Sequence, residues 1–220
     1  MTARNPRAEI PPGGSAEALP CAAPPGETLE NAAAAALACT RCATLPLGPR
    51  PTFRVSPTAR LLIIGQAPGT RVHATGIPWN DPSGERLRDW LGLGPGLFYD
   101  SSRVAIVPAG LCYPGRLPRG GDAPPRPECA PLWHPRLIGP MRDIRLTLLV
   151  GSHAIRAVLG RGAAAALGET VRGFAAPLAA GRFPLPHPSW RTRAWAARRP
   201  WFEAEVLPAL RAAVRANLAD

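Results

Sequence analysis

The chain has 220 residues, 46% of them hydrophobic, which is enough for one substantial core and short for two full domains. Its formal net charge of +11 comes from arginine alone, because the sequence contains no lysine. The absence of lysine excludes a Walker phosphate loop and a lysine Schiff base, while the positive charge favours a polyanionic partner such as nucleic acid. Because no apolar run is long enough to span a membrane and the N-terminus lacks a signal-peptide pattern, we expect a cytoplasmic protein.

The N-terminal segment, residues 1–28, is rich in Pro, Ala and Gly. Such a segment cannot bury enough apolar surface to offset its ordering entropy, so we expect a disordered tail followed by a single domain at residues 29–220. Cys21 falls in this tail. An Ala-rich run from Glu27 to Ala38 predicts the first helix, with Thr28 as its N-cap.

In the segment Arg60–Ile64, Arg60 is followed by four apolar residues without polar alternation, a run that is typical of a parallel strand buried on both faces. It ends in Gly-Gln-Ala-Pro-Gly at residues 65–69. The glycines and the proline favour a tight turn with exposed backbone amides at the carboxyl end of the strand, where open α/β sheets bind ligands. An ordinary strand-to-loop turn remains the alternative.

Strands and helices alternate through the rest of the chain. We expect a capped helix at 81–92, strands at 103–107 and 146–151, helices at 129–141 and 152–159, a short strand within 182–189 and a terminal helix at 200–219. Prolines in the fourth strand predict an edge position or a distorted strand. The predicted fold is therefore α/β, a three-layer α/β/α sandwich with a short, mainly parallel four-stranded sheet.

Four cysteines form a pattern that suggests a metal centre. Cys39 and Cys42 make a C-x2-C pair, while Cys112 and Cys129 lie in loops beside prolines. Four thiolates from distant segments can ligate zinc or an iron-sulfur cluster. A zinc ribbon usually repeats C-x2-C in its second half, which this chain does not, so the spacing favours a 4Fe-4S cluster, with zinc as the alternative.

The ordered set of motifs resembles the iron-sulfur uracil-DNA glycosylases, often called family 4, and their relatives. The set comprises Cys39-x2-Cys42, Gly65-Gln66-Ala67-Pro68-Gly69, Thr75-Gly76-Ile77-Pro78-Trp79, Cys112, Cys129 and His187-Pro188-Ser189. The resemblance implies a structural 4Fe-4S cluster, a pocket for a flipped deaminated base, and DNA containing such bases as the partner of a monomeric enzyme. The implied reaction is hydrolysis of the N-glycosidic bond in base excision repair.

The resemblance also implies roles for individual residues. His187, or the backbone amides after Gly65, would stabilise the departing base, and Trp79 would stack on it. The resemblance implies that Gln66, His187 and Asp81 act in catalysis and that Gly65, Ala67, Trp79 and Asn80 bind the base. It also implies that Gly69, Ser189, Trp190 and Arg191 bind DNA, and that Cys39, Cys42, Cys112 and Cys129 bind the metal. Trp190 or Arg191 would fill the gap left in the duplex.

Three positions depart from the family pattern. Gln66 stands where the family usually has Glu, residues 70–73 lack the usual acidic residues, and Pro108 stands where an Asn would read uracil. Gln66 could orient a water molecule while Asp81 or Glu85 supplies the missing charge, and Asn80 could substitute for the missing Asn. A catalytically silent module that binds damaged or abasic DNA is the alternative function. An unrelated iron-sulfur or zinc protein would require the motif order to be coincidental.

Overall fold

The computed structural model describes residues 24–219. Four strands form one sheet: β1 (Leu61–Ile64), β2 (Val104–Ile106), β3 (Leu146–Val150) and β4 (Arg182–Leu185). The α-helices are α1 (Leu29–Leu37), α2 (Thr70–Thr75), α3 (Pro82–Leu91), α4 (Pro95–Phe98), α5 (Cys129–Ile138), α6 (Ser152–Leu159), α7 (Arg161–Ala165), α8 (Leu167–Arg172), α9 (Ala175–Ala179), α10 (Arg191–Ala197) and α11 (Leu207–Leu218). Within residues 24–219, none of these helices combines the length and apolarity that a bilayer crossing requires.

The sheet is parallel throughout, with the strand order β2-β1-β3-β4. In the register, Leu61 pairs with Val104 on one side and with Leu146 on the other. After β2 the chain crosses β1 to add β3, so the direction of strand addition reverses between β1 and β3. Open α/β sheets form their ligand crevice at such a reversal. The predicted edge position of the proline-containing β4 is confirmed.

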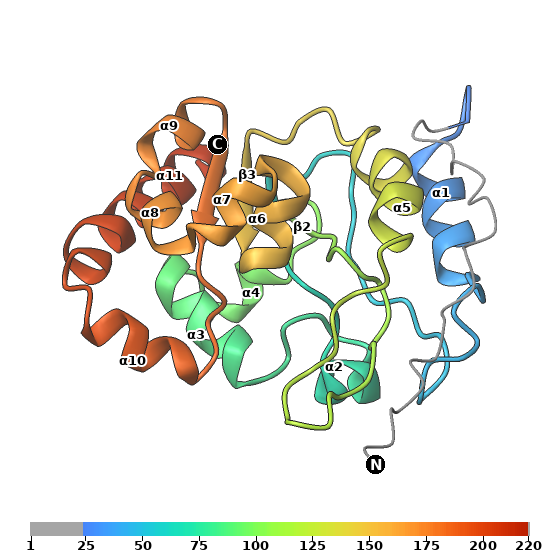
Figure 1. The fold of residues 1–220 in the computed structure, drawn as a ribbon. Coiled ribbons are helices and arrows are strands. Elements are labelled where there is room, and N and C mark those ends of the chain that lie inside the picture. The colour runs from blue at the N-terminus through green and yellow to red at the C-terminus, as the bar shows by residue number, and fades with distance from the viewer. Residues whose placement is uncertain (1–23, 220) are drawn as a thin grey trace, which may run out of the picture.

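Alternate residues of β1 enter two different hydrophobic cores, which explains the unbroken apolar run in its sequence. Leu61 and Ile63 belong to a core with residues of α3 and α11, whereas Leu62 and Ile64 pack with residues of α1, α5 and α6. Helices consequently cover both faces of the sheet, with α1 and α5 on one side and α3, α8 and α11 on the other (Figure 1). The predicted three-layer α/β/α fold is confirmed.

Local differences from the predicted elements occur where the helices are short or irregular. The terminal helix starts with a π-helical turn at Phe202–Val206 before α11, and α5 ends at Ile138, three residues earlier than predicted. Cys129 is the first residue of α5, as in the predicted helix 129–141, and not part of the preceding loop. The sequence predicted none of the six helices of seven residues or fewer that residues 24–219 form, because so few turns leave little periodicity. These helices are α2, α4, α7, α8, α9 and α10.

The first described residues lie within the predicted tail. Glu27 forms an ion pair with Arg136 of α5, with 2.5 Å between Oε1 and Nη2. Thr28 is the N-cap of α1, as predicted, and its side chain accepts a hydrogen bond from the Asn31 amide. Cys21 and the rest of the tail prediction, up to residue 23, lie outside the described residues.

The double-sided burial of β1 predicts a large loss of stability when its side chains are shortened. Ile63 is fully buried, so Ile63→Ala should lower the free energy of unfolding by about 2–5 kcal/mol, because it leaves a cavity beside two neighbouring strands. Urea denaturation followed by circular dichroism measures this. The matched control is Leu97→Ala, whose side chain is 37% exposed and should change stability little. Equal losses in both variants would contradict the prediction.

Candidate active site

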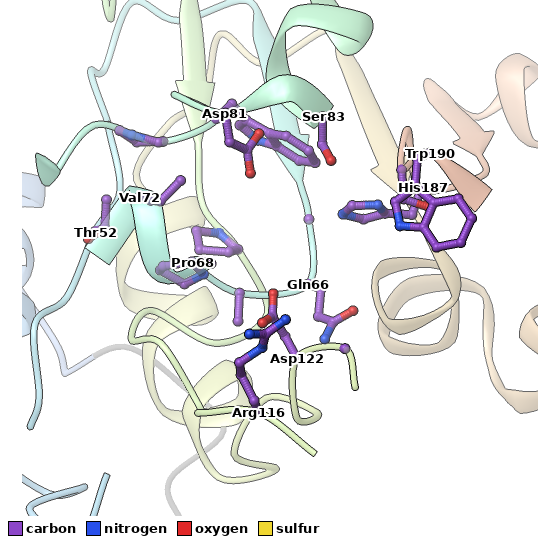
Figure 2. Close-up of a pocket in the computed structure, with 18 of the residues that line it drawn as sticks. Thr52, Gln66, Pro68, Val72, Asp81, Ser83, Arg116, Asp122, His187 and Trp190 are labelled. Carbon is purple, nitrogen blue, oxygen red and sulfur yellow. The ribbon is translucent and has the colours of Figure 1, made fainter. Parts of the chain in front are cut away.

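The carboxyl ends of β1, β2 and β4 meet around one cavity of about 580 Å³. Its wall includes residues 65–69 after β1, Pro108 after β2, and His187 and Ser189 after β4. The loop between β2 and α5 supplies residues 116–117 and 120–122. Figure 2 shows side chains from these segments directed toward a common space. The cavity therefore lies at the edge of the sheet that the strand order favours for a ligand.

Trp79 is held in an unusual backbone conformation in this wall. Its φ of 56° is the only positive value at a non-glycine position among residues 24–219. The Trp79 carbonyl accepts hydrogen bonds from Arg88 Nη1 (3.3 Å) and from the Tyr99 hydroxyl (3.2 Å). It also lies so close to Gly84 that a Cβ atom there would come within 1.7 Å of the carbonyl oxygen. These contacts fix the indole, which packs against Gly65.

His187 packs beside Trp79, with 5.7 Å between ring centroids and an interplanar angle of 32°. Burial lowers the pKa of His187, an effect that the carboxylate of Asp81 partly opposes. The imidazole is therefore neutral at pH 7 and can donate one hydrogen bond. Arg86 of α3 donates through Nη1 to the carbonyls of Pro188 (3.1 Å) and Ser189 (2.6 Å), which holds the segment that carries His187.

Asp81 has both a structural and a cavity-facing oxygen. Its Oδ1 accepts a hydrogen bond from the Gly84 amide at 2.8 Å and so caps α3. The other oxygen, Oδ2, lies 4.0 Å from where a Cβ atom on Gly69 would be, in the wall of the cavity. Helix capping alone would explain an Asp at this position, but it leaves this second oxygen available to a ligand.

Sequence reasoning missed a second carboxylate, that of Asp122. Its Oδ2 lies 3.5 Å from the same Cβ position on Gly69, and Figure 2 shows Asp81 and Asp122 facing the cavity from different segments. Burial raises the pKa of Asp122; the neighbouring Arg116 guanidinium opposes this shift and Asp81 reinforces it. The residue lies in a loop rich in Gly, Pro and Arg, where no hydrophobic periodicity marks a functional side chain.

Gln66 fastens this loop to the end of β1. Its side-chain nitrogen Nε2 donates a hydrogen bond of 3.1 Å to the carbonyl of Ala123. Gln66 also lines the cavity. Gln66 therefore makes a structural contact that the sequence did not predict, in addition to the catalytic role expected of it.

The cavity brings together most of the predicted catalytic, base-binding and DNA-binding residues. Those that line it are Gly65, Gln66, Ala67, Gly69, Trp79, Asp81, His187, Ser189, Trp190 and Arg191. Asn80, expected to bind the base, is not among the lining residues, although its neighbour Trp79 is. The carbonyl of Pro108 is 3.0 Å from Nε2 of His134, a residue that does not line the cavity.

The four predicted metal-binding cysteines line a second, smaller cavity, together with apolar residues such as Leu111 and Trp133. Burial raises the pKa of Cys112 to about 11 and that of Cys129 to about 12, and the nearby thiols add to both shifts. The Leu111 amide donates to Cys129 Sγ at 3.3 Å. Across residues 24–219, no three His, Cys, Asp or Glu side chains are grouped closely enough to hold a metal ion. The sulfurs thus surround a space instead of meeting at one point.

The sequence of this chain was compared with known protein families. The model of the uracil DNA glycosylase superfamily matches residues 53–211. This range includes every residue that lines the larger cavity except Thr52, and it begins after Cys39 and Cys42. The match covers well over half of the sequence, and the parallel sheet and the cavity at its carboxyl edge fit it. The chain therefore belongs to the uracil DNA glycosylase superfamily.

Proposed function

We propose that this protein is a monofunctional DNA glycosylase that hydrolyses the N-glycosidic bond of uracil or another deaminated base in DNA. The observation that carries the proposal is the convergence of Trp79, His187 and Asp81 on one cavity at the carboxyl edge of the sheet. Membership of the superfamily supports glycosylase chemistry in general. The absence of lysine excludes strand scission through a lysine Schiff base.

Departure of the base leaves negative charge on the base and positive charge on the sugar. His187, neutral and partly buried, would donate a hydrogen bond to the base oxygen on which the negative charge develops. A donor fixed before the reaction is effective because it needs no reorganisation when the charge appears. The Trp79 indole, held by its backbone contacts, would stack on a face of the base and contribute about 1–3 kcal/mol.

Two carboxylates could position the attacking water and stabilise the cationic sugar. Asp81 offers Oδ2, because Oδ1 caps α3, and Asp122 offers its carboxylate from the loop between β2 and α5. These two carboxylates would take over the role of the Glu that the iron-sulfur glycosylases usually have at the position of Gln66. The amide oxygen of Gln66 is a third acceptor for that water, since Nε2 already bonds Ala123.

Residues at the mouth would bind the DNA backbone and fill the gap left by the flipped nucleotide. Ser189 and the backbone at Gly69 would contact phosphates beside the target. The Trp190 ring is 72% exposed, and the Arg191 guanidinium lies 5.0 Å from its centroid, so both side chains are available for insertion into the duplex. Asn80, which does not line the cavity, would need to move before it could read the base edge.

The cysteine site fits a thiolate-ligated group, because four thiols surround a single small cavity with apolar walls. We propose a structural 4Fe-4S cluster held by Cys39, Cys42, Cys112 and Cys129, with zinc as the alternative. Such a group would tie the segment after α1 to the loop between β2 and α5. The raised thiol pKa values mean that binding would release protons.

Labelled oligonucleotides test the reaction. Single-stranded and mismatched duplex DNA carrying uracil, hypoxanthine or xanthine would be incubated with the protein and then treated with alkali, which breaks the strand at abasic sites. Cleavage at one of these bases, only after alkali, supports a monofunctional glycosylase. Intact strands throughout, together with salt-dependent DNA binding, would instead support a catalytically silent binding module, which the Gln66 and Pro108 departures favour.

Removal of the proposed hydrogen-bond donor should slow base release. His187→Leu should lower the single-turnover rate by about 100- to 1,000-fold, the usual cost of losing one donor to a developing anion. His187→Gln keeps an N–H donor and should recover part of this rate. Thermal melts check that both variants fold. Equal rates in His187→Leu and the wild type would contradict the assigned role.

Removal of the Asp122 charge should also slow hydrolysis and change its pH dependence. Asp122→Asn should lower the rate by about 100-fold, as expected for loss of a water-positioning carboxylate. Because the pKa of Asp122 is raised, the wild-type rate should fall on acidification at a higher pH than an ordinary aspartate would cause.

A pH–rate profile shows whether Asp122→Asn abolishes this fall in rate at acidic pH. Asp81→Asn is the matched comparison, because Asn caps a helix about as well as Asp and the change removes only the charge. A wild-type profile in Asp122→Asn would leave Asp81 as the sole carboxylate of the mechanism and refute the role of Asp122.

Protein purified under low oxygen should be brown and contain about four iron atoms per chain. Cys112→Ser and Cys129→Ser should lose the visible absorption and the iron, because each removes a ligand. Cys21→Ser is the control and should keep both. A colourless protein with about one zinc ion per chain would favour the alternative metal.

A further inference from the structure

We propose that the turn at residues 116–122 inserts Leu117 into the base stack of duplex DNA, as a second wedge besides Trp190. This inference rests on the proposed function for the identity of its partner, DNA. It adds a contact from the loop between β2 and α5, a segment separate from the one that follows β4.

The turn presents Leu117 on a fixed backbone. Arg116 and Asp122 form an isolated antiparallel bridge, the Leu117 amide donates to the Gly121 carbonyl at 2.9 Å, and the Gly120 amide donates to the Leu117 carbonyl at 2.9 Å. Gly120 and Gly121 have φ values of 85° and 87°, which other residues adopt at a cost. The Leu117 side chain is nevertheless 47% exposed.

The loop is fastened to the body of the protein on both sides of the turn. Ala123 accepts the hydrogen bond from Gln66 Nε2, and its own amide donates to the Gly115 carbonyl at 2.8 Å. Pro125 packs on Gly110 so closely that a Cβ atom there would come within 2.7 Å of Pro125 Cβ. A wedge needs such support, because a side chain on a loose loop would lose more entropy on insertion.

Leu117 and Trp190 belong to the same cavity mouth. Both line the cavity, and the turn reaches the second segment: a Cβ atom on Gly121 would lie 3.7 Å from Nη1 of Arg191. Figure 2 shows Trp190 on one side of the cavity and Arg116, which precedes Leu117, on another. DNA that delivers a nucleotide into the cavity would therefore meet both exposed apolar side chains.

The charges around these two side chains favour nucleic acid over a protein partner. Exposed arginines flank both of them, namely Arg116, Arg119, Arg191 and Arg193. Guanidinium groups bind phosphates, while an apolar side chain between them can enter a base step and separate its bases. Leu117 alone would be an ordinary exposed residue; its position on a supported turn, among arginines and at the mouth shared with Trp190, gives it this role.

The test uses binding and base unstacking and does not depend on turnover. The probe is a duplex with a 2′-fluorinated deoxyuridine, which resists cleavage, next to 2-aminopurine, whose fluorescence rises on unstacking. Leu117→Ala and Trp190→Ala should each weaken duplex binding by about tenfold and reduce the fluorescence rise. Binding to the single-stranded probe should change by no more than about twofold, because no paired stack has to be opened. Leu97→Ala is the matched control and should behave as the wild type.

The dependence on salt separates a wedge from a phosphate contact. Leu117→Ala should leave the slope of affinity against salt unchanged, whereas Arg119→Ala should reduce it. The proposal would be overturned if Leu117→Ala bound the duplex and raised the fluorescence as the wild type does. It would also be overturned if the variant lost as much affinity for the single-stranded probe as for the duplex. If the wild type releases no base from any substrate but Leu117→Ala still weakens duplex binding, the second wedge stands and the glycosylase function fails.

Discussion

Parallel pairing of β1 with a strand on each side is the constraint on which the rest of the structure depends. It directs the carboxyl ends of the strands to the same edge of the sheet, so segments distant in sequence can line one cavity. It also requires β1 to be apolar on both faces, and the two cores that enclose it hold the helices in place. The position of the cavity thus follows from the way the sheet is assembled.

The cavity combines groups whose environments differ in a chemically useful way. Partial burial lowers the pKa of His187, so its imidazole is neutral at pH 7, whereas the carboxylates of Asp81 and Asp122 both lie near Gly69. A neutral donor on one side and negative charge on another match a reaction that separates an anionic base from a cationic sugar. Under the proposed function, a glutamine at position 66 is compatible with this scheme, because Asp81 and Asp122 can supply negative charge from other segments.

Elements with a strong local signal were predictable from the sequence. The continuous apolar run of β1 and the Asp81 and Gly92 caps of α3 are examples, and both are found where predicted. Asp122 was not predictable, since its place in the cavity wall depends on a loop that the Gln66–Ala123 hydrogen bond fastens to the end of β1. The placement of Asn80 depended on the left-handed backbone at Trp79, which no local sequence rule indicates for a tryptophan.

The close approach of Gly84 to the Trp79 carbonyl has a consequence for engineering this protein. Replacing a helix glycine by alanine is a common route to higher thermal stability, since glycine costs an α-helix about 1 kcal/mol relative to alanine. At position 84 an added methyl group would collide with the carbonyl and displace the indole from the cavity wall. At this position the usual stabilising substitution would therefore destabilise the protein and disturb its binding site, so stabilising changes have to be made at other positions.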